Sequence, residues 1–119
     1  PKVEQILREA IKFEGFPYSQ TNRMGNAVDC SSLVDRALRN AGLPNTMGRD
    51  LVTANMDNDP RFYRIPLSQA QRGDILFKPG HVAFYLGNNE TFEAFDYGVP
   101  TGYGKGKDRF TSAYRIKGT

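Results

Sequence analysis

The chain contains one cysteine, Cys30, and one histidine, His81, so any thiol or imidazole chemistry has to use these two residues. A thiol is a strong nucleophile once deprotonated, and a helix N-terminus or a neighbouring imidazolium favours that form. Cys30 follows Asp29, a good N-cap, and precedes apolar residues at helical spacing. The pattern predicts Cys30 in the first turn of a helix, where free N–H groups also suit an oxyanion. The alternative is a buried structural thiol.

His81 begins a predicted strand, and a hairpin joins it to a second strand that carries carboxylates. A loop of two or four residues centred on residues 88–89 would place His81 opposite Asp96. A three-residue loop or a bulge would move the partner toward Glu93. Either carboxylate could hold one ring nitrogen and leave the other to exchange a proton with a nucleophile. We therefore expect a cysteine–histidine–acid arrangement.

Helices in the first half of the chain and strands in the second must position these residues. Helical spacing predicts helices over 3–11 and 30–41, with a weaker helical stretch over 49–56. Alternation and turn signals predict strands at 62–65, 75–77, 81–86, 91–95 and 109–116. The glycine-rich stretch 97–107 is expected to be a mobile loop. This order predicts an α+β fold with an antiparallel sheet packed on the helices.

Length and composition indicate a single domain over residues 1–119, either complete or cut from a longer protein. No apolar run approaches the roughly 20 residues that span a bilayer, so no membrane insertion is expected. One cysteine and one histidine exclude a disulfide framework and argue against a metal cluster. The net charge of the chain is +3, and residues 105–119 alone hold five basic residues against one acidic residue, which suits either a solvated strand or contact with an anionic polymer such as cell wall. The sequence contains no recognised nucleic-acid motif, so no nucleic-acid partner is expected. A monomer is also expected.

Several blocks of the sequence resemble motifs of the NlpC family of bacterial cell-wall cysteine peptidases. They are residues 29–34 (DCSSLV), 72–77 (RGDILF), 81–88 (HVAFYLGN) and 91–94 (TFEA), with residues 114–116 (YRI) as a closing strand. The resemblance implies a papain-like fold in which the cysteine helix packs on a small antiparallel sheet. It implies Cys30 as nucleophile and His81 as general base and acid. Glu93 aligns with the third catalytic position, where the family commonly has histidine, and Asp96 is the runner-up.

Three further residues are implied near the thiol. Tyr18 stands where the family often has a tyrosine close to the thiol, although the usual Trp-Gly-Gly after it is replaced by residues 19–21 (SQT). Asp29 either caps the helix only or also contacts an amine of the substrate. Ser31 either is a favourable first-turn residue or offers its N–H or hydroxyl near the oxyanion.

The resemblance implies a peptidoglycan hydrolase, a single catalytic domain that cleaves the stem peptide between D-glutamate and the next diamino acid through a thioester. Three alternatives stay open: an N-acetylmuramoyl-L-alanine amidase of the phage-lysin type, a non-catalytic cell-wall binding module, and acyl transfer to an amine. We expect peptidoglycan as the partner and no metal or other cofactor. The expected location is extracellular, periplasmic or at the cell wall, reached through a parent protein, a phage or a secretion system.

Overall fold

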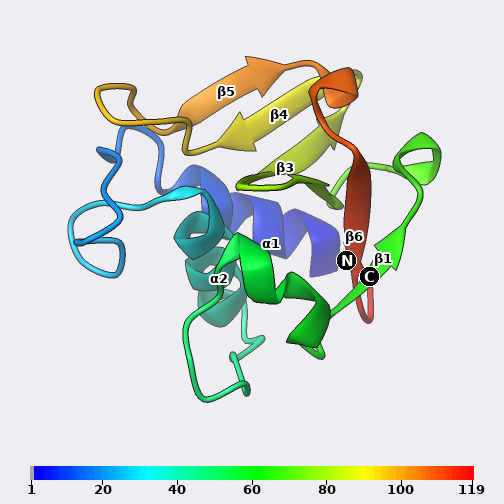
Figure 1. Cartoon of the computed structure of the whole chain (residues 1–119), viewed down its shortest axis with the longest axis horizontal. Coiled ribbons are helices and arrows are strands. Elements are labelled where there is room, and N and C mark those ends of the chain that lie inside the picture. Colours follow the sequence, from blue (N-terminus) through cyan, green and yellow to red (C-terminus); the bar gives the residue numbers. More distant parts are fainter. Residues whose placement is uncertain (1) are drawn as a thin grey trace.

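The computed structural model describes residues 2–119, which form an α+β fold with one six-stranded antiparallel sheet (Figure 1). The sheet order is β1-β6-β2-β3-β4-β5, so β1 and β5 are its edges. The helices are α1 (Lys2–Ile11) and α2 (Cys30–Asn40), and the strands are β1 (Phe62–Ile65), β2 (Ile75–Lys78), β3 (His81–Gly87), β4 (Glu90–Glu93), β5 (Gly102–Lys105) and β6 (Ser112–Ile116). Three 3-10 turns complete the fold: η1 (Thr53–Asn58), η2 (Leu67–Gln69) and η3 (Lys107–Arg109). This confirms the predicted fold class.

Helix α2 begins at Cys30, as the sequence predicts. The side chain of Asp29 accepts a hydrogen bond from the Ser32 N–H at 2.8 Å, and the Ser32 hydroxyl accepts one from the Asp29 N–H at 2.9 Å. This reciprocal capping box leaves the helix start with little freedom to fray. The thiol is therefore attached to a rigid first turn.

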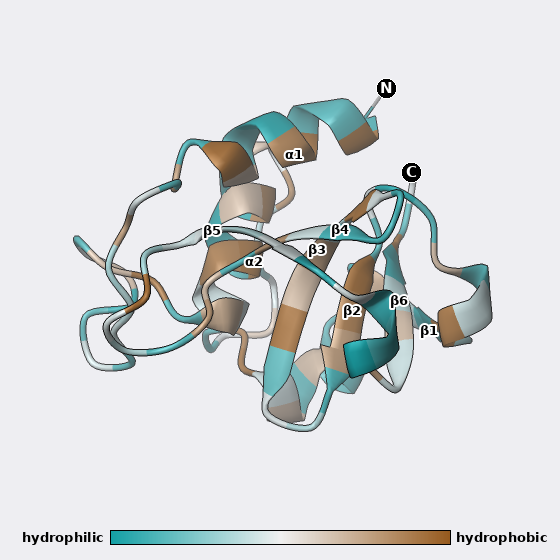
Figure 2. Ribbon diagram, turned by 90° about the horizontal axis from the view of Figure 1, so that it is seen from above, coloured by the Kyte–Doolittle hydropathy of each residue, from teal (hydrophilic) through white to brown (hydrophobic). Residues whose placement is uncertain are grey.

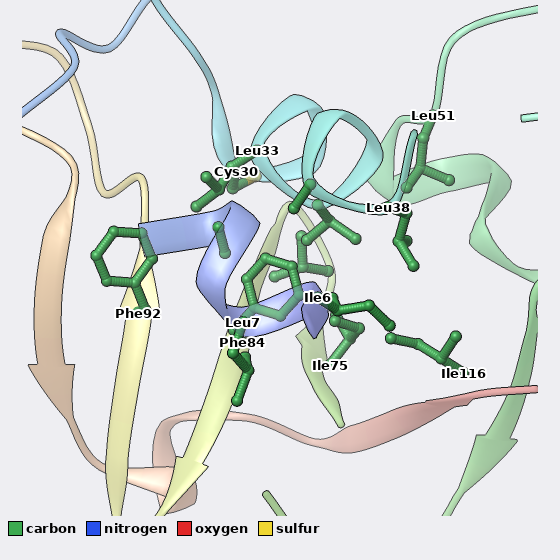
Figure 3. Close-up of a cluster of buried hydrophobic side chains, with 14 of the residues drawn as sticks. Ile6, Leu7, Cys30, Leu33, Leu38, Leu51, Ile75, Phe84, Phe92 and Ile116 are labelled. Atoms are coloured by element: carbon green, nitrogen blue, oxygen red, sulfur yellow. The ribbon is translucent and has the colours of Figure 1, made fainter. Parts of the chain in front are cut away.

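Both helices pack on one face of the sheet and bury their apolar stripes against it. Figure 2 shows the hydrophobic side of α1 turned toward the sheet and its hydrophilic side turned outward. Side chains from both helices and the central strands form the main core, and Cys30 belongs to this cluster (Figure 3). A smaller apolar cluster, which includes Leu76 and Phe110, covers the opposite face. Burial on both faces holds the strand that starts at His81 in a fixed position relative to α2.

The hairpin between β3 and β4 contains a bulge that decides which carboxylate reaches His81. Residues 88–89 have positive φ angles of 51° and 64° and form the turn, and the register shifts between Tyr85 and Gly87. The simple two-residue register holds only at Gly87 and Glu90, beside the turn, and does not continue along the strands to set His81 opposite Asp96. Strand β4 ends at Glu93, and Asp96 lies beyond the strand.

The stretch 97–107, expected to be a mobile loop, contains strand β5, which pairs along the whole of β4. The expectation was wrong because glycine can serve close packing as well as mobility. At Gly104 a Cβ atom would lie only 2.9 Å from the Thr91 hydroxyl and 3.0 Å from Glu93 Oε2. The weaker helical stretch predicted over 49–56 is also different: it is the 3-10 turn η1, which starts at Thr53.

Candidate active site

The fold brings the N-terminus of α2 against the turn between β2 and β3, and with it Cys30 against His81. The Cys30 Sγ lies 3.9 Å from the carbonyl oxygen of Gly80, the residue before His81. Cys30 is only 6% exposed, yet it lines a cavity. The N-cap side chain takes the N–H of Ser32, so the first-turn N–H groups of Cys30 and Ser31 are the ones available to an oxyanion.

His81 is held from the other side by Glu93. The Nε2 atom of His81 and the Oε1 atom of Glu93 are 2.7 Å apart, and Glu93 is fully buried. The imidazole also stacks on Phe110, with ring centroids 5.8 Å apart. Because Nε2 is engaged with Glu93, Nδ1 is the ring nitrogen left to exchange a proton with the thiol.

Two residues that the sequence analysis did not single out complete the surroundings of Glu93. Arg109 donates from Nη2 to Oε2 at 2.7 Å and from Nη1 to Oε1 at 3.3 Å, and the Thr91 hydroxyl also donates to Oε2. Thr91 was detectable, because residues i and i+2 of a strand share a face. Arg109 carried no local signal, since its approach depends on how the chain returns after β5.

These contacts set the charges of the site. Burial alone would raise the pKa of Glu93, but hydrogen bonds from His81, Arg109 and Thr91 outweigh it and lower the pKa to about 2. Burial alone would lower the pKa of His81, but interactions with Cys30 and Glu93 outweigh it and raise the pKa to about 9. His81 is therefore an imidazolium at neutral pH, and an imidazolium beside a thiol favours the thiolate.

Asp29 and Ser31 are both engaged by Arg23, a third residue missed from the sequence. Arg23 donates from Nε to Asp29 Oδ2 at 2.8 Å and from Nη2 to the Ser31 hydroxyl at 2.9 Å. Its Nη2 also donates to the carbonyl oxygen of Leu51 at 2.6 Å. The Asp29 carboxylate is thus paired with the Arg23 guanidinium and both of its oxygens accept hydrogen bonds, which favours the capping interpretation over contact with a substrate amine.

Tyr18 and Gly80 each line two cavities, one of which is also lined by Cys30 and the other by His81. The smaller cavity, of about 280 Å³, is lined by Cys30 and by the loop and helix residues around it. The larger, of about 450 Å³, is lined by His81 and by residues that follow β2 and β4. Burial is the main reason that the pKa of Tyr18 is raised, and the nearby Cys30 adds to it.

Asp96 is exposed on the wall of the larger cavity, and its carboxylate accepts a hydrogen bond from the Tyr97 N–H at 2.7 Å. The structure thus brings Glu93, and not Asp96, against His81. Within residues 2–119, no group of three or more His, Cys, Asp or Glu side chains is placed to hold a metal ion. In that same part of the chain no helix is long and apolar enough to cross a membrane.

Comparisons with known proteins point to one family. The model of the NlpC/P60 family matches residues 15–110. The bifunctional muramidase/DL-endopeptidase CwlT of Bacillus subtilis is 30% identical over 130 residues, which cover 96% of this chain and 36% of CwlT. The peptidoglycan endopeptidase RipA of Mycobacterium tuberculosis is 32% identical over 117 residues, covering 81% of this chain and 23% of RipA. The chain thus spans about a third or less of the length of these curated relatives.

Solved structures show the same likeness in three dimensions. A structure of RipA matches 97% of this chain and 62% of its own, with a TM-score of 0.78 and 25% identity. The NlpC/p60 domain of the peptidoglycan hydrolase SagA matches 97% of both chains, with a TM-score of 0.70 and 26% identity. RipA structures have been solved with changes at a histidine, a cysteine and a glutamate.

Proposed function

Because the chain belongs to the NlpC/P60 family, we propose that it is a peptidoglycan hydrolase, a cysteine endopeptidase that cuts the stem peptide between D-glutamate and the diamino acid. The observation that carries this proposal is the single thiol at a capped helix N-terminus beside an imidazole that a buried carboxylate holds. The names of CwlT and RipA as endopeptidases support the reaction class. The described residues act as one catalytic domain at the cell wall.

In the first half of the reaction the Cys30 thiolate attacks the carbonyl carbon of the scissile amide. The negative oxygen of the tetrahedral intermediate is stabilised by the first-turn N–H groups of Cys30 and Ser31 and by the positive end of the α2 dipole. His81 then gives its Nδ1 proton to the leaving nitrogen, the C–N bond breaks, and a thioester remains on Cys30.

In the second half a water molecule attacks the thioester. Neutral His81 now takes a proton from the water through the same nitrogen, and the thiolate leaves. The carboxylic acid product departs, and the thiolate–imidazolium pair is restored. No step requires a metal ion.

Glu93 acts on this cycle through His81, by fixing the ring orientation and stabilising the imidazolium. In RipA, the histidine and the glutamate that were changed lie 12 positions apart, the same separation as between His81 and Glu93. This agreement supports Glu93 at the third catalytic position, with Arg109 and Thr91 holding its carboxylate in place.

Three residues shape the thiol side of the site in this proposal. Asp29 positions the helix start through its cap and its ion pair with Arg23. Ser31 contributes its backbone N–H, because its hydroxyl accepts a hydrogen bond from Arg23 and donates one to Asp29. Tyr18 lines both cavities, so its ring and hydroxyl are placed to contact a bound peptide.

Digestion of purified cell wall tests the proposal. The wild-type protein should release fragments with a new amino end on the diamino acid, identified by mass spectrometry, and Cys30→Ser and Cys30→Ala should release none. New amino ends on alanine would identify an amidase instead. Wall lysis that persists without the thiol would refute the nucleophile, and wall binding without any cleavage would indicate a binding module.

A further inference from the structure

In the proposed reaction the two halves of the substrate lie in different cavities, one lined by Cys30 and the other by His81. Cys30 and Ser31, which attack and stabilise the carbonyl group, line only the smaller cavity, whereas His81 lines only the larger. In the proposed reaction the leaving amine takes the proton of His81. The fragment that leaves with this amine therefore occupies the larger cavity.

Basic side chains dominate the wall of this larger cavity. Lys78 lies directly opposite His81 in the β2–β3 register, and both line the cavity together with Arg109. Within residues 2–119, Lys78 makes no ion pair. The one carboxylate on this wall is that of Asp96, because Glu93 is buried behind His81 and Arg109.

Arg109 is rigidly held and still has hydrogen-bond capacity to offer. Of its five N–H groups, one from Nε reaches the carbonyl oxygen of Lys105 at 2.8 Å, and one from each terminal nitrogen reaches Glu93. Two N–H groups are left over. The side chain is 36% exposed and lines the cavity, so a ligand can reach them without the cost of ordering a mobile side chain.

We propose that this cavity is a subsite for a free carboxylate on the leaving fragment of the substrate, bound by Lys78 and Arg109. The inference rests on the proposed endopeptidase function and adds a substrate feature to it. Asp96 also lines this cavity, and its carboxylate would repel a bound carboxylate. In a stem peptide the carboxylate has two possible sources: the side chain of the diamino acid or the C-terminus of the peptide.

Four synthetic tetrapeptides separate these sources. Each contains L-alanine, γ-linked D-glutamate, a diamino acid and D-alanine. The diamino acid is either diaminopimelate, with a side-chain carboxylate, or lysine, without one, and the C-terminus is either free or amidated. We expect kcat/KM for the peptide with the bound carboxylate to exceed that of its partner without it by about fivefold. The excess should shrink as salt is added, because screening weakens exposed ion pairs.

Variants assign the effect to this cavity. Lys78→Met should remove the preference by lowering kcat/KM for the carboxylate peptides, and a urea unfolding curve that matches the wild-type protein shows an intact fold. Asp96→Asn should increase the preference. Lys107→Met is the matched control, because Lys107 lies over the ring of Tyr85 and lines neither cavity.

The outcomes distinguish failure of the carboxylate subsite from failure of the proposed endopeptidase function. If all four peptides are cleaved at equal rates, the endopeptidase function stands and the carboxylate subsite is refuted. A preference that survives Lys78→Met, or that Lys107→Met removes equally, also refutes it. If the wild-type protein cleaves neither these peptides nor cell wall, the proposed function fails and the subsite falls with it.

Discussion

Gly104 offers a sharp test of the role of Glu93, because a side chain added at this position of β5 would press on the carboxylate of Glu93. Replacing it by alanine adds a Cβ atom 2.9 Å from the Thr91 hydroxyl and 3.0 Å from Glu93 Oε2. Ordinary contacts of a Cβ atom begin near 3.4 Å, so these atoms have to move by about half an ångström. Gly102, on the same strand, meets nothing closer than 3.9 Å, so Gly102→Ala is the matched control.

The structure gives the size of the effect. Overpacking of this kind costs about 1–3 kcal/mol of folding free energy, so the variant should still fold. A misplacement of about 1 Å in a catalytic constellation can cost about 100-fold in rate, so half of that should lower kcat about tenfold. The control should stay within about twofold of the wild-type protein.

The pH profile separates this effect from simple destabilisation, because only displacement of the carboxylate predicts a direction of shift for the alkaline limb of activity. His81 has a pKa of about 9, and its contact with Glu93 is one of the causes. Displacing the carboxylate weakens this contact, so the pKa of His81 falls toward its ordinary 6.5 and the alkaline limb of activity moves to lower pH. Hydrolysis of a stem peptide between pH 5 and 10 measures this limb. A folded Gly104→Ala protein with the kcat and alkaline limb of Gly102→Ala would refute the reasoning.

Three other predictions concern the same charges. Iodoacetamide should modify folded Cys30 rapidly at neutral pH, as followed by intact mass; labelling that waits for denaturant would indicate an inert buried thiol. Arg109→Met should move the alkaline limb to higher pH, because Glu93 then acts on His81 without an opposing cation, while Lys107→Met should leave it in place. Glu93 has a pKa of about 2 in the folded protein against 4.5 ordinarily. Its ionisation therefore stabilises the fold above pH 4.5, and this contribution is lost as pH falls toward 2. Glu93→Gln should show a smaller loss of unfolding free energy across that window in urea titrations.

The sequence was most informative where function depends on local chemistry. The cap at Asp29 and the helix that starts at Cys30 are determined by neighbouring residues, and the structure confirms both. The partner of His81 stayed open because a β-bulge shifts the hairpin by one residue, and no residue pattern marked that bulge. Arg109 could not be found at all, since it meets Glu93 across 16 positions through the strand that was read as a loop.

The position of β5 at the edge of the sheet has a consequence for how the protein responds to heat. Edge strands open more easily than central ones, and β4 is the one strand of the sheet that pairs with β5. Each opening lifts Gly104 from the Glu93 carboxylate and admits water behind His81. Reversible fraying of the four residues of β5 therefore loosens the hold of Glu93 on His81 and lowers activity while the core stays folded. On warming, activity should decline before cooperative unfolding and return on cooling, with amide exchange of β5 reporting the same equilibrium.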